Sequence, residues 1–278
     1  MIRVFPGHLV FLLSALLFYE NTRGQQVVTP DANAVAFNDL FLNSAWSAAY
    51  ANPAMVDSLV LSTSIQQAGR WSAGVFSSRS FLLSELNEGG VALNVKLPSC
   101  SALSVAFSAK GYELFRRSRA VAGLMKSFGG QLQAGMRLEY DTEVFGEGYG
   151  SCSSVRIVAG LAARLTGRMD AAAVFARPAR QGCALYLPYY AAGLQYRFSS
   201  RWICSAQLAS RNQRLTLGAA FHYHPMPGLS FTAGIGGRPA LMAMGCAVDC
   251  RRLRLYISAS HRQLTGVTPS VGFVVPLP

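Results

Sequence analysis

The sequence predicts an all-β protein in which about 14 antiparallel strands close into a transmembrane β-barrel. Three observations support this fold class. Segments of about ten residues alternate between apolar and polar side chains, the connections between them alternate between tight and longer, and only 14% of the residues are charged. A typical soluble domain carries about 25% charged residues, so this chain has little charge with which to cover a water-facing surface. We expect the barrel to follow a cleaved signal peptide and an N-terminal helical plug.

Residues 1–24 are predicted to be a secretory signal peptide. The apolar run Leu9–Phe18 follows Arg3 and precedes a polar stretch that ends at Gly24. A spanning helix needs about 20 apolar residues, whereas a basic start, a short apolar centre and a small final residue are typical of a signal peptide. No later run is long enough for a spanning helix, so a mature chain in a membrane has to be a closed barrel. We therefore expect it in the cell outer membrane.

Residues 25–56 are predicted to form a helical plug, or hatch, ahead of the barrel. From residue 31 onward the apolar side chains do not alternate with a period of two, and a stretch rich in alanine leads into the turn Asn52-Pro53-Ala54. A segment of this length suits the interior of a barrel, and a helix outside the barrel is the alternative. We expect Asn52, Pro53 and Ala54 to gate the interior.

Residues 57–278 are assigned to the barrel. Leu253, Leu255 and Ile257 alternate with Arg252 and Arg254, and successive side chains of a strand point to opposite faces. In a membrane barrel the apolar face would meet lipid and the arginines would line the interior. The same pattern defines the candidate strands 69–78, 89–98, 101–112, 118–128, 130–142, 152–166, 168–178, 188–199, 201–211, 214–224, 228–238, 240–249, 251–263 and 269–277.

The connections between these segments support the same topology. Outer-membrane barrels have short periplasmic turns and longer outer loops. The expected tight turns are 99–100, 129, 167, 200, 225–227 and 249–250, and the longer loops include 79–88, 113–117, 143–151, 179–187 and 264–268. An apolar segment at 57–66 would be a fifteenth strand; either it belongs to the plug, or one of the other candidate strands is wrongly divided.

Several stretches resemble a known family. "NSAWSAAYANPAMV" is similar to the hatch of FadL-type outer-membrane transporters, and "SRSFLLSELNEGGVALNVKLP" and "LRLYISASHRQLTGVTPSVGFVV" resemble the PorV/PorQ-type branch of that superfamily. The resemblance covers essentially the whole mature chain. It implies a 14-stranded barrel with a plug, which serves either uptake of hydrophobic molecules or type IX protein secretion. The ending "FVVPLP" departs from the family because it lacks a terminal aromatic residue.

The face that would line the interior is strongly cationic, in a chain of net charge +12. Two interpretations remain open. Like charges in a wet interior raise the local concentration of anions, which would favour passage of an anionic solute; alternatively, the arginines pair with Glu139, Asp141 and the plug and simply fill the interior. The candidate lining residues are Lys110, Arg137, Glu139, Arg156, Arg164, Arg197, Arg214, Arg252 and Arg254.

No catalytic residue, metal ligand or cofactor is predicted. Ser260 and His261 are adjacent in a strand, so they face opposite sides and cannot form a nucleophile–base pair. His222 and His224 share a face, but no third ligand is predictably placed beside them. The six cysteines fit no zinc-binding spacing. We therefore do not expect an enzyme.

Two functions remain for an outer-membrane barrel of this kind. The first is passage of a hydrophobic or amphipathic small molecule across the membrane. The second is a non-transport structural or interaction barrel of the PorV/PorQ kind, associated with type IX secretion. The expected partners are outer-membrane lipid and lipopolysaccharide, together with a hydrophobic solute or a secretion-system protein; export argues against nucleic acid. A soluble exported β-sandwich with its arginines in water is a third alternative.

Overall fold

The computed structural model describes most of the chain after residue 70. The described residues are 71–79, 82, 87–97, 101–128, 131–146, 150–180, 188–211, 214–236, 241–250, 253–262 and 266–277. The predicted signal peptide (1–24), the plug (25–56) with Asn52, Pro53 and Ala54, and the segment 57–66 lie outside these residues.

The described part of the chain folds into fourteen β-strands. They are β1 Trp71–Arg79, β2 Asn87–Leu97, β3 Ser101–Tyr112, β4 Phe115–Phe128, β5 Leu132–Phe145, β6 Gly150–Arg164, β7 Met169–Arg180, β8 Tyr189–Arg197, β9 Trp202–Arg211, β10 Arg214–Met226, β11 Leu229–Gly236, β12 Leu241–Cys250, β13 Leu253–Arg262 and β14 Gly266–Leu277.

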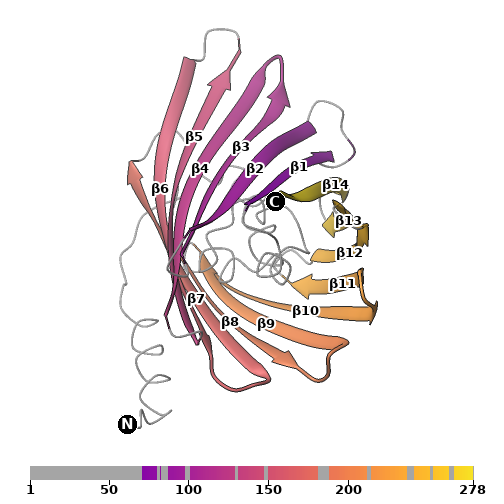
Figure 1. Ribbon diagram of the computed structural model, residues 1–278. Helices are drawn as coiled ribbons and strands as arrows, with labels where there is room; N and C mark the ends of the chain where they lie inside the picture. Colours follow the sequence, from indigo (N-terminus) through magenta and orange to yellow (C-terminus); the bar gives the residue numbers. More distant parts are fainter. Residues whose placement is uncertain are drawn as a thin grey trace. The chain divides into compact units, whose positions relative to one another are not determined.

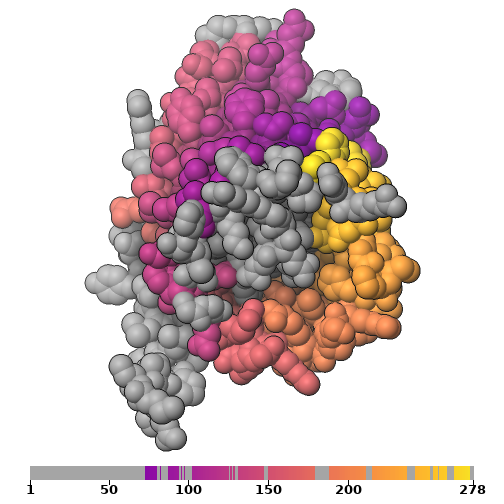
Figure 2. Space-filling model, in the orientation of Figure 1, coloured from indigo at the N-terminus to yellow at the C-terminus, as the bar shows by residue number. Residues whose placement is uncertain are grey.

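These strands close into one antiparallel barrel. Each strand pairs with its neighbours in sequence, and β14 returns to pair with β1, where Val75 lies opposite Phe273. Figure 1 shows β14 beside β1, and in Figure 2 the yellow C-terminal strand lies against the indigo first strand. Closure removes the exposed strand edges that would otherwise leave backbone groups unpaired. The prediction of a closed antiparallel barrel with 14 strands is confirmed.

The two faces of the sheet have opposite character. Along β5, Met136 and Leu138 are 60% and 50% exposed on the outside, whereas the alternating Arg137 and Glu139 are 3% and 1% exposed on the inside. A soluble sheet buries its apolar face. This barrel has the reverse arrangement, with its apolar face exposed on the outside and its charged face buried on the inside. The outer face carries large exposed apolar side chains on nearly every strand, among them Val91, Phe107, Leu124, Leu161, Leu194, Leu217, Ile235, Met244, Ile257 and Phe273.

The strand connections divide the barrel into two ends. We call the end with the connections 165–168, 198–201 and 227–228 the turn end, and the opposite end, with the connections 80–86 and 181–188, the loop end. At the turn end, Gly228 follows Pro227 with φ +81°, which is the geometry of a type II turn with proline first and glycine second.

Several expected connections are shorter than predicted or displaced, and two of them show the reason. The loop expected at 113–117 is reduced to Glu113 and Leu114, because Arg116 and Arg117 pair with β3. This hairpin requires glycine at Gly111, where φ is +126° and a Cβ atom would lie 1.9 Å from the Phe115 carbonyl oxygen. The turn expected at 249–250 is not found there, since Asp249 and Cys250 still pair with β13.

No helix among the described residues is long and apolar enough to cross a membrane.

Candidate functional site

The inner face of the barrel carries its charged side chains in two groups at different heights. Most of these charges come from β4, β5 and β6 near the loop end, and the rest come from β6, β7 and β8 at the turn end. We call the first set the loop-end group; it comprises Arg117, Arg119, Arg137, Glu139, Asp141, Glu143 and Arg156. We call the second set the turn-end group; it comprises Arg164, Asp170 and Arg197.

Asp141 joins two arginines of β4 in the loop-end group. Arg119 Nε donates to Asp141 Oδ1 at 2.8 Å, and Arg117 Nε donates to the same oxygen at 3.2 Å. Arg117 also lies 3.6 Å from Glu143. The Asp141 side chain is only 2% exposed. Charge-assisted hydrogen bonds of this kind are among the stronger polar contacts in proteins.

Glu139 forms the deepest node of the loop-end group. Arg156 Nε donates to Glu139 Oε2 at 2.7 Å, a second nitrogen of the Arg156 guanidinium contacts the same oxygen, and Arg137 Nε lies 2.6 Å from Oε1. The side chains of Glu139, Arg137 and Arg156 are 1%, 3% and 7% exposed. A carboxylate buried this deeply is retained only when it is paired, and here it has a guanidinium on each oxygen.

Asp170 organises the turn-end group in the same way. Arg164 Nε lies 3.4 Å from Asp170 Oδ1, and a terminal nitrogen of Arg197 contacts Oδ2. Arg164 and Arg197 are 46% and 35% exposed, so this group is wetter than the loop-end group. Its contribution to stability is therefore smaller, because solvent screens exposed ion pairs.

The register of the strands brings these charges together. Arg119 pairs directly opposite Asp141, Glu139 opposite Arg156, and Arg164 opposite Asp170. Opposite charges directly across a strand pair are favourable, and a shift of one residue would turn each of them to the other face. The described ion pairs of the two groups contain six arginines and four carboxylates, which leaves a local excess of positive charge.

An apolar belt separates the two charged groups. On β6 the inner side chains between Arg156 and Arg164 are Val158, Gly160 and Ala162. The belt continues on β7, β8 and β9 as a cluster of buried side chains that are small except for one tyrosine. The apolar wall as a whole comprises Val158, Ala162, Ala172, Val174, Ala176, Tyr189, Ala191 and Ala209. Eight residues separate Arg156 from Arg164, which corresponds to about 26 Å along the strand.

Hydroxyl and imidazole side chains are prominent among the described inner residues of the last five strands. His222 Nδ1 is hydrogen-bonded to Thr232 Oγ1 at 3.0 Å, and the hydroxyls of Ser258 and Ser270 are hydrogen-bonded to each other. The described residues contain no group of three potential metal ligands. The hydrogen bond with Thr232 gives the His222 ring nitrogen a partner. Arg254 Nε lies 3.1 Å from Asp249 in an ion pair separate from the two charged groups.

Some of the predicted lining residues lie in the two charged groups, and others lie apart from them. The structure brings Arg137, Glu139 and Arg156 together, and it joins Arg164 to Arg197 through Asp170. Lys110 is half-buried on β3, and Arg254 lies apart on β13. Arg214 begins β10, and Arg252 lies outside the described residues.

Four members of the charged groups, Arg117, Arg119, Glu143 and Asp170, are not among the residues that the sequence predicts for the inner face. Glu143 falls within the expected loop 143–151. Arg117 was assigned to a loop because the predicted strand began at residue 118, and Arg119 was not counted on the inner face. Asp170 follows the turn at 165–168, and only its register opposite Arg164 identifies it as a partner.

Neither protein-family profiles nor curated protein sequences match this chain. Solved structures do match it in fold. The deltaS2S3 mutant of the TodX monoaromatic hydrocarbon channel has a TM-score of 0.57 at 9% identity, covering 74% of this chain and 89% of that chain. The CymD monoaromatic hydrocarbon channel has a TM-score of 0.56 at 10% identity, covering 84% and 93%. The Acinetobacter baumannii outer membrane protein Omp33 has a TM-score of 0.55 at 8% identity, covering 76% and 99%. The chain therefore shares the fold of outer-membrane barrels.

Proposed function

We propose that this protein is an outer-membrane channel of FadL-like type through which a hydrophobic or amphipathic small molecule passes. The observation that carries the proposal is the order charged, apolar, charged along the inner wall of β6 and its neighbours. An amphipathic molecule with an anionic head would meet guanidinium groups at both ends, while its apolar part lies against the apolar wall. The fold shared with TodX and CymD, which are hydrocarbon channels, supports transport.

The outer face supports a place in the membrane. Its exposed apolar side chains would be costly to leave in water, at about 25 cal/mol per Å², and they become favourable in hydrocarbon. At the turn end, Trp202 stacks on Tyr223 with 4.0 Å between ring centroids, and Tyr196 meets Phe198 edge-on at 4.7 Å. Aromatic girdles of this kind mark the membrane interfaces of outer-membrane barrels.

The segment 25–56 would close the interior in this proposal, with Asn52, Pro53 and Ala54 at the gate. Such a plug would have to move or leave a path beside it when a solute passes. The partners would be outer-membrane lipid, lipopolysaccharide and the transported solute.

Uptake by proteoliposomes tests the proposal. The full protein is reconstituted, and entry of a radiolabelled long-chain amphiphile is compared with entry of a sugar of similar mass. Ala172→Trp fills the apolar wall from β7, where Ala172 is 6% exposed, and should abolish amphiphile entry. Ala159→Trp adds the same ring to the outer face of β6, where Ala159 is exposed, and should leave entry unchanged. Heat-modifiable gel mobility verifies that both variants fold.

The alternative function is a structural or interaction barrel of the PorV/PorQ kind. The pairing of the deepest arginines with Glu139 and Asp141 favours it, because paired charges fill an interior without attracting a solute. If the wild-type vesicles take up no amphiphile and a secretion-system protein co-purifies with the barrel, the transport proposal is overturned.

A further inference from the structure

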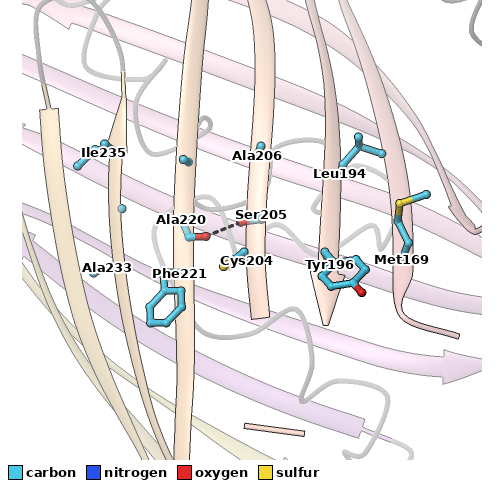
Figure 3. A pocket seen from close by; sticks show the side chains of 12 residues that line it. Met169, Leu194, Tyr196, Cys204, Ser205, Ala206, Ala220, Phe221, Ala233 and Ile235 are labelled. Atoms are coloured by element: carbon cyan, nitrogen blue, oxygen red, sulfur yellow. Dashed lines mark hydrogen bonds between the residues drawn. The ribbon is translucent and has the colours of Figure 1, made fainter. Parts of the chain in front are cut away.

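The outer face of the barrel has a hollow of about 600 Å³ over β7 to β11. Large apolar side chains border it, and small ones form its floor. Figure 3 shows Leu194, Met169 and Tyr196 on one side, Phe221 and Ile235 on the other, and Ala206 between them. These side chains belong to the outward-facing set, so the hollow opens away from the barrel interior and is separate from the two charged groups.

The strand register explains why this stretch of the wall is hollow. Leu194, Ala206, Ala219 and Ile235 lie in one row across four strands. Neighbouring strands are about 4.8 Å apart, so the two alanines leave a trough roughly two strands wide between a leucine and an isoleucine. In the adjacent row, Cys204 and Ala233 are the small residues beside Tyr196 and Phe221. We call this hollow the outer trough.

The outer trough runs toward the turn end, where the chain places exposed arginines and aromatic rings. Met169 lines the trough and directly follows Arg168, and Trp202 directly follows Arg201; both arginines are exposed. Trp202 packs on Phe221, which also lines the trough, with 4.6 Å between ring centroids. Both arginines lie in the turns 165–168 and 198–201, beyond the paired residues of the strands. An apolar trough that ends at aromatic rings, with two exposed arginines in the turns beyond them, matches the layout of a phospholipid, with its acyl chain, interface and phosphate.

We propose that the outer trough is a binding site for one phospholipid with an anionic headgroup. An acyl chain occupies the floor formed by Ala206 and Ala219, and the phosphate binds Arg168 and Arg201. A flexible acyl chain fits into a narrow trough better than the convex wall of a second barrel does. The two arginines supply positive charge that is complementary to the phosphate. This site rests on the membrane location proposed above but not on transport.

Fluorescence quenching tests the site, because Trp202 lies beside the trough. The full protein with Trp46→Phe and Trp71→Phe keeps Trp202 as its single tryptophan and is placed in phosphatidylcholine vesicles. Phosphatidylglycerol or phosphatidylcholine with brominated acyl chains is then added at equal mole fractions. An arginine near a membrane surface contributes about fivefold in binding an anionic lipid, so quenching should favour phosphatidylglycerol.

Matched variants identify which groups carry the preference. Arg168→Gln and Arg201→Gln should each lower the phosphatidylglycerol preference by about fivefold. Arg116→Gln removes an exposed arginine of β4 near the loop end and should leave the preference unchanged. Ala206→Leu with Ala219→Leu fills the trough and should remove the preference, whereas Ala122→Leu, on the outer face of β4, should not.

Three results would overturn the lipid site. Equal quenching by the two lipids in the unsubstituted trough would show that the membrane only solvates this face. A dimer in native mass spectrometry that Ala206→Leu with Ala219→Leu dissociates would identify a second copy as the occupant. Failure of the protein to enter vesicles would overturn the membrane location as well, whereas insertion without lipid preference would overturn this site alone.

Discussion

At the scale of single residues, Glu139 is the side chain on which the inner wall depends most. It is 1% exposed and lies between Arg137 and Arg156. A buried ion pair contributes little net stability, but removal of one partner leaves an uncompensated buried charge. Glu139 sits between two guanidinium groups, so its loss would leave both of them without this carboxylate.

Glu139→Gln should lower the free energy of unfolding by about 3–5 kcal/mol. Urea unfolding in lipid vesicles, followed by tryptophan fluorescence, measures this change. Glu143→Gln is the matched control, because Glu143 lies 3.6 Å from Arg117 with both side chains 13% exposed; its cost should be smaller than that of Glu139→Gln, because this ion pair is longer and less buried. Equal costs for the two variants would show that Glu139 is not the central node.

At the scale of one element, β13 shows how the two faces of a strand differ. Ile257 is 57% exposed on the outer face near the middle of the strand, whereas Leu255 is 36% exposed and closer to the turn end. Arg254 faces inward and pairs with Asp249. The strand therefore presents outer-face and interior positions within four residues.

Ile257→Arg should destabilise the inserted barrel by about 2–4 kcal/mol, because arginine on the lipid face is most costly at the midplane. Leu255→Arg should cost less, since it lies nearer the interface. Arg254→Ser should cost less than about 1 kcal/mol, because its partner Asp249 is 49% exposed. Urea titration of the folded fraction by heat-modifiable mobility ranks the three variants. Equal tolerance of all three would contradict a lipid-facing outer surface.

At the scale of the whole molecule, closure depends on a strand pair that is far apart in sequence. Ser77 on β1 lies opposite Val271 on β14. No local turn brings these strands together, so their pairing requires the twist and register of all the strands between them to agree.

Oxidation of paired cysteines tests this closure and its register. In a background without the six native cysteines, Ser77→Cys with Val271→Cys should form a disulfide and yield a cyclised band of altered mobility on non-reducing denaturing gels. Ser77→Cys with Phe273→Cys is the control. The Cα atoms of residues 77 and 273 are diagonal neighbours about 7–8 Å apart, and this distance is beyond the usual reach of a disulfide. Cross-linking of the control pair alone would mean that the seam has a different register.

The sequence predicted the strands well because each signal is local. Apolar and polar side chains alternate within about ten residues, so fourteen strands were recognised with boundaries a few residues from those observed. The misses occurred at strand ends. Arg117 and Cys250 extend β4 and β12 beyond the predicted strands because they pair across the sheet, and no pattern inside either strand reveals such a partner.

The candidate site was predicted only in part for the same reason. Alternation identified Arg137, Glu139 and Arg156 as sharing the inner face, but not that Glu139 lies between the two arginines. The row of Leu194, Ala206, Ala219 and Ile235 comes from four strands, and each strand by itself is an ordinary alternating segment.

The amino-acid sequence alone determined the barrel class, the approximate strands and, within most of them, which side chains share a face, because a period of two is a property of the chain itself. Only the tertiary structure decided which arginine meets which carboxylate, how the apolar wall divides the two charged groups, and where the outer trough lies. These features depend on the register between strands. Register is a relation between distant segments, and it is set when the whole barrel closes.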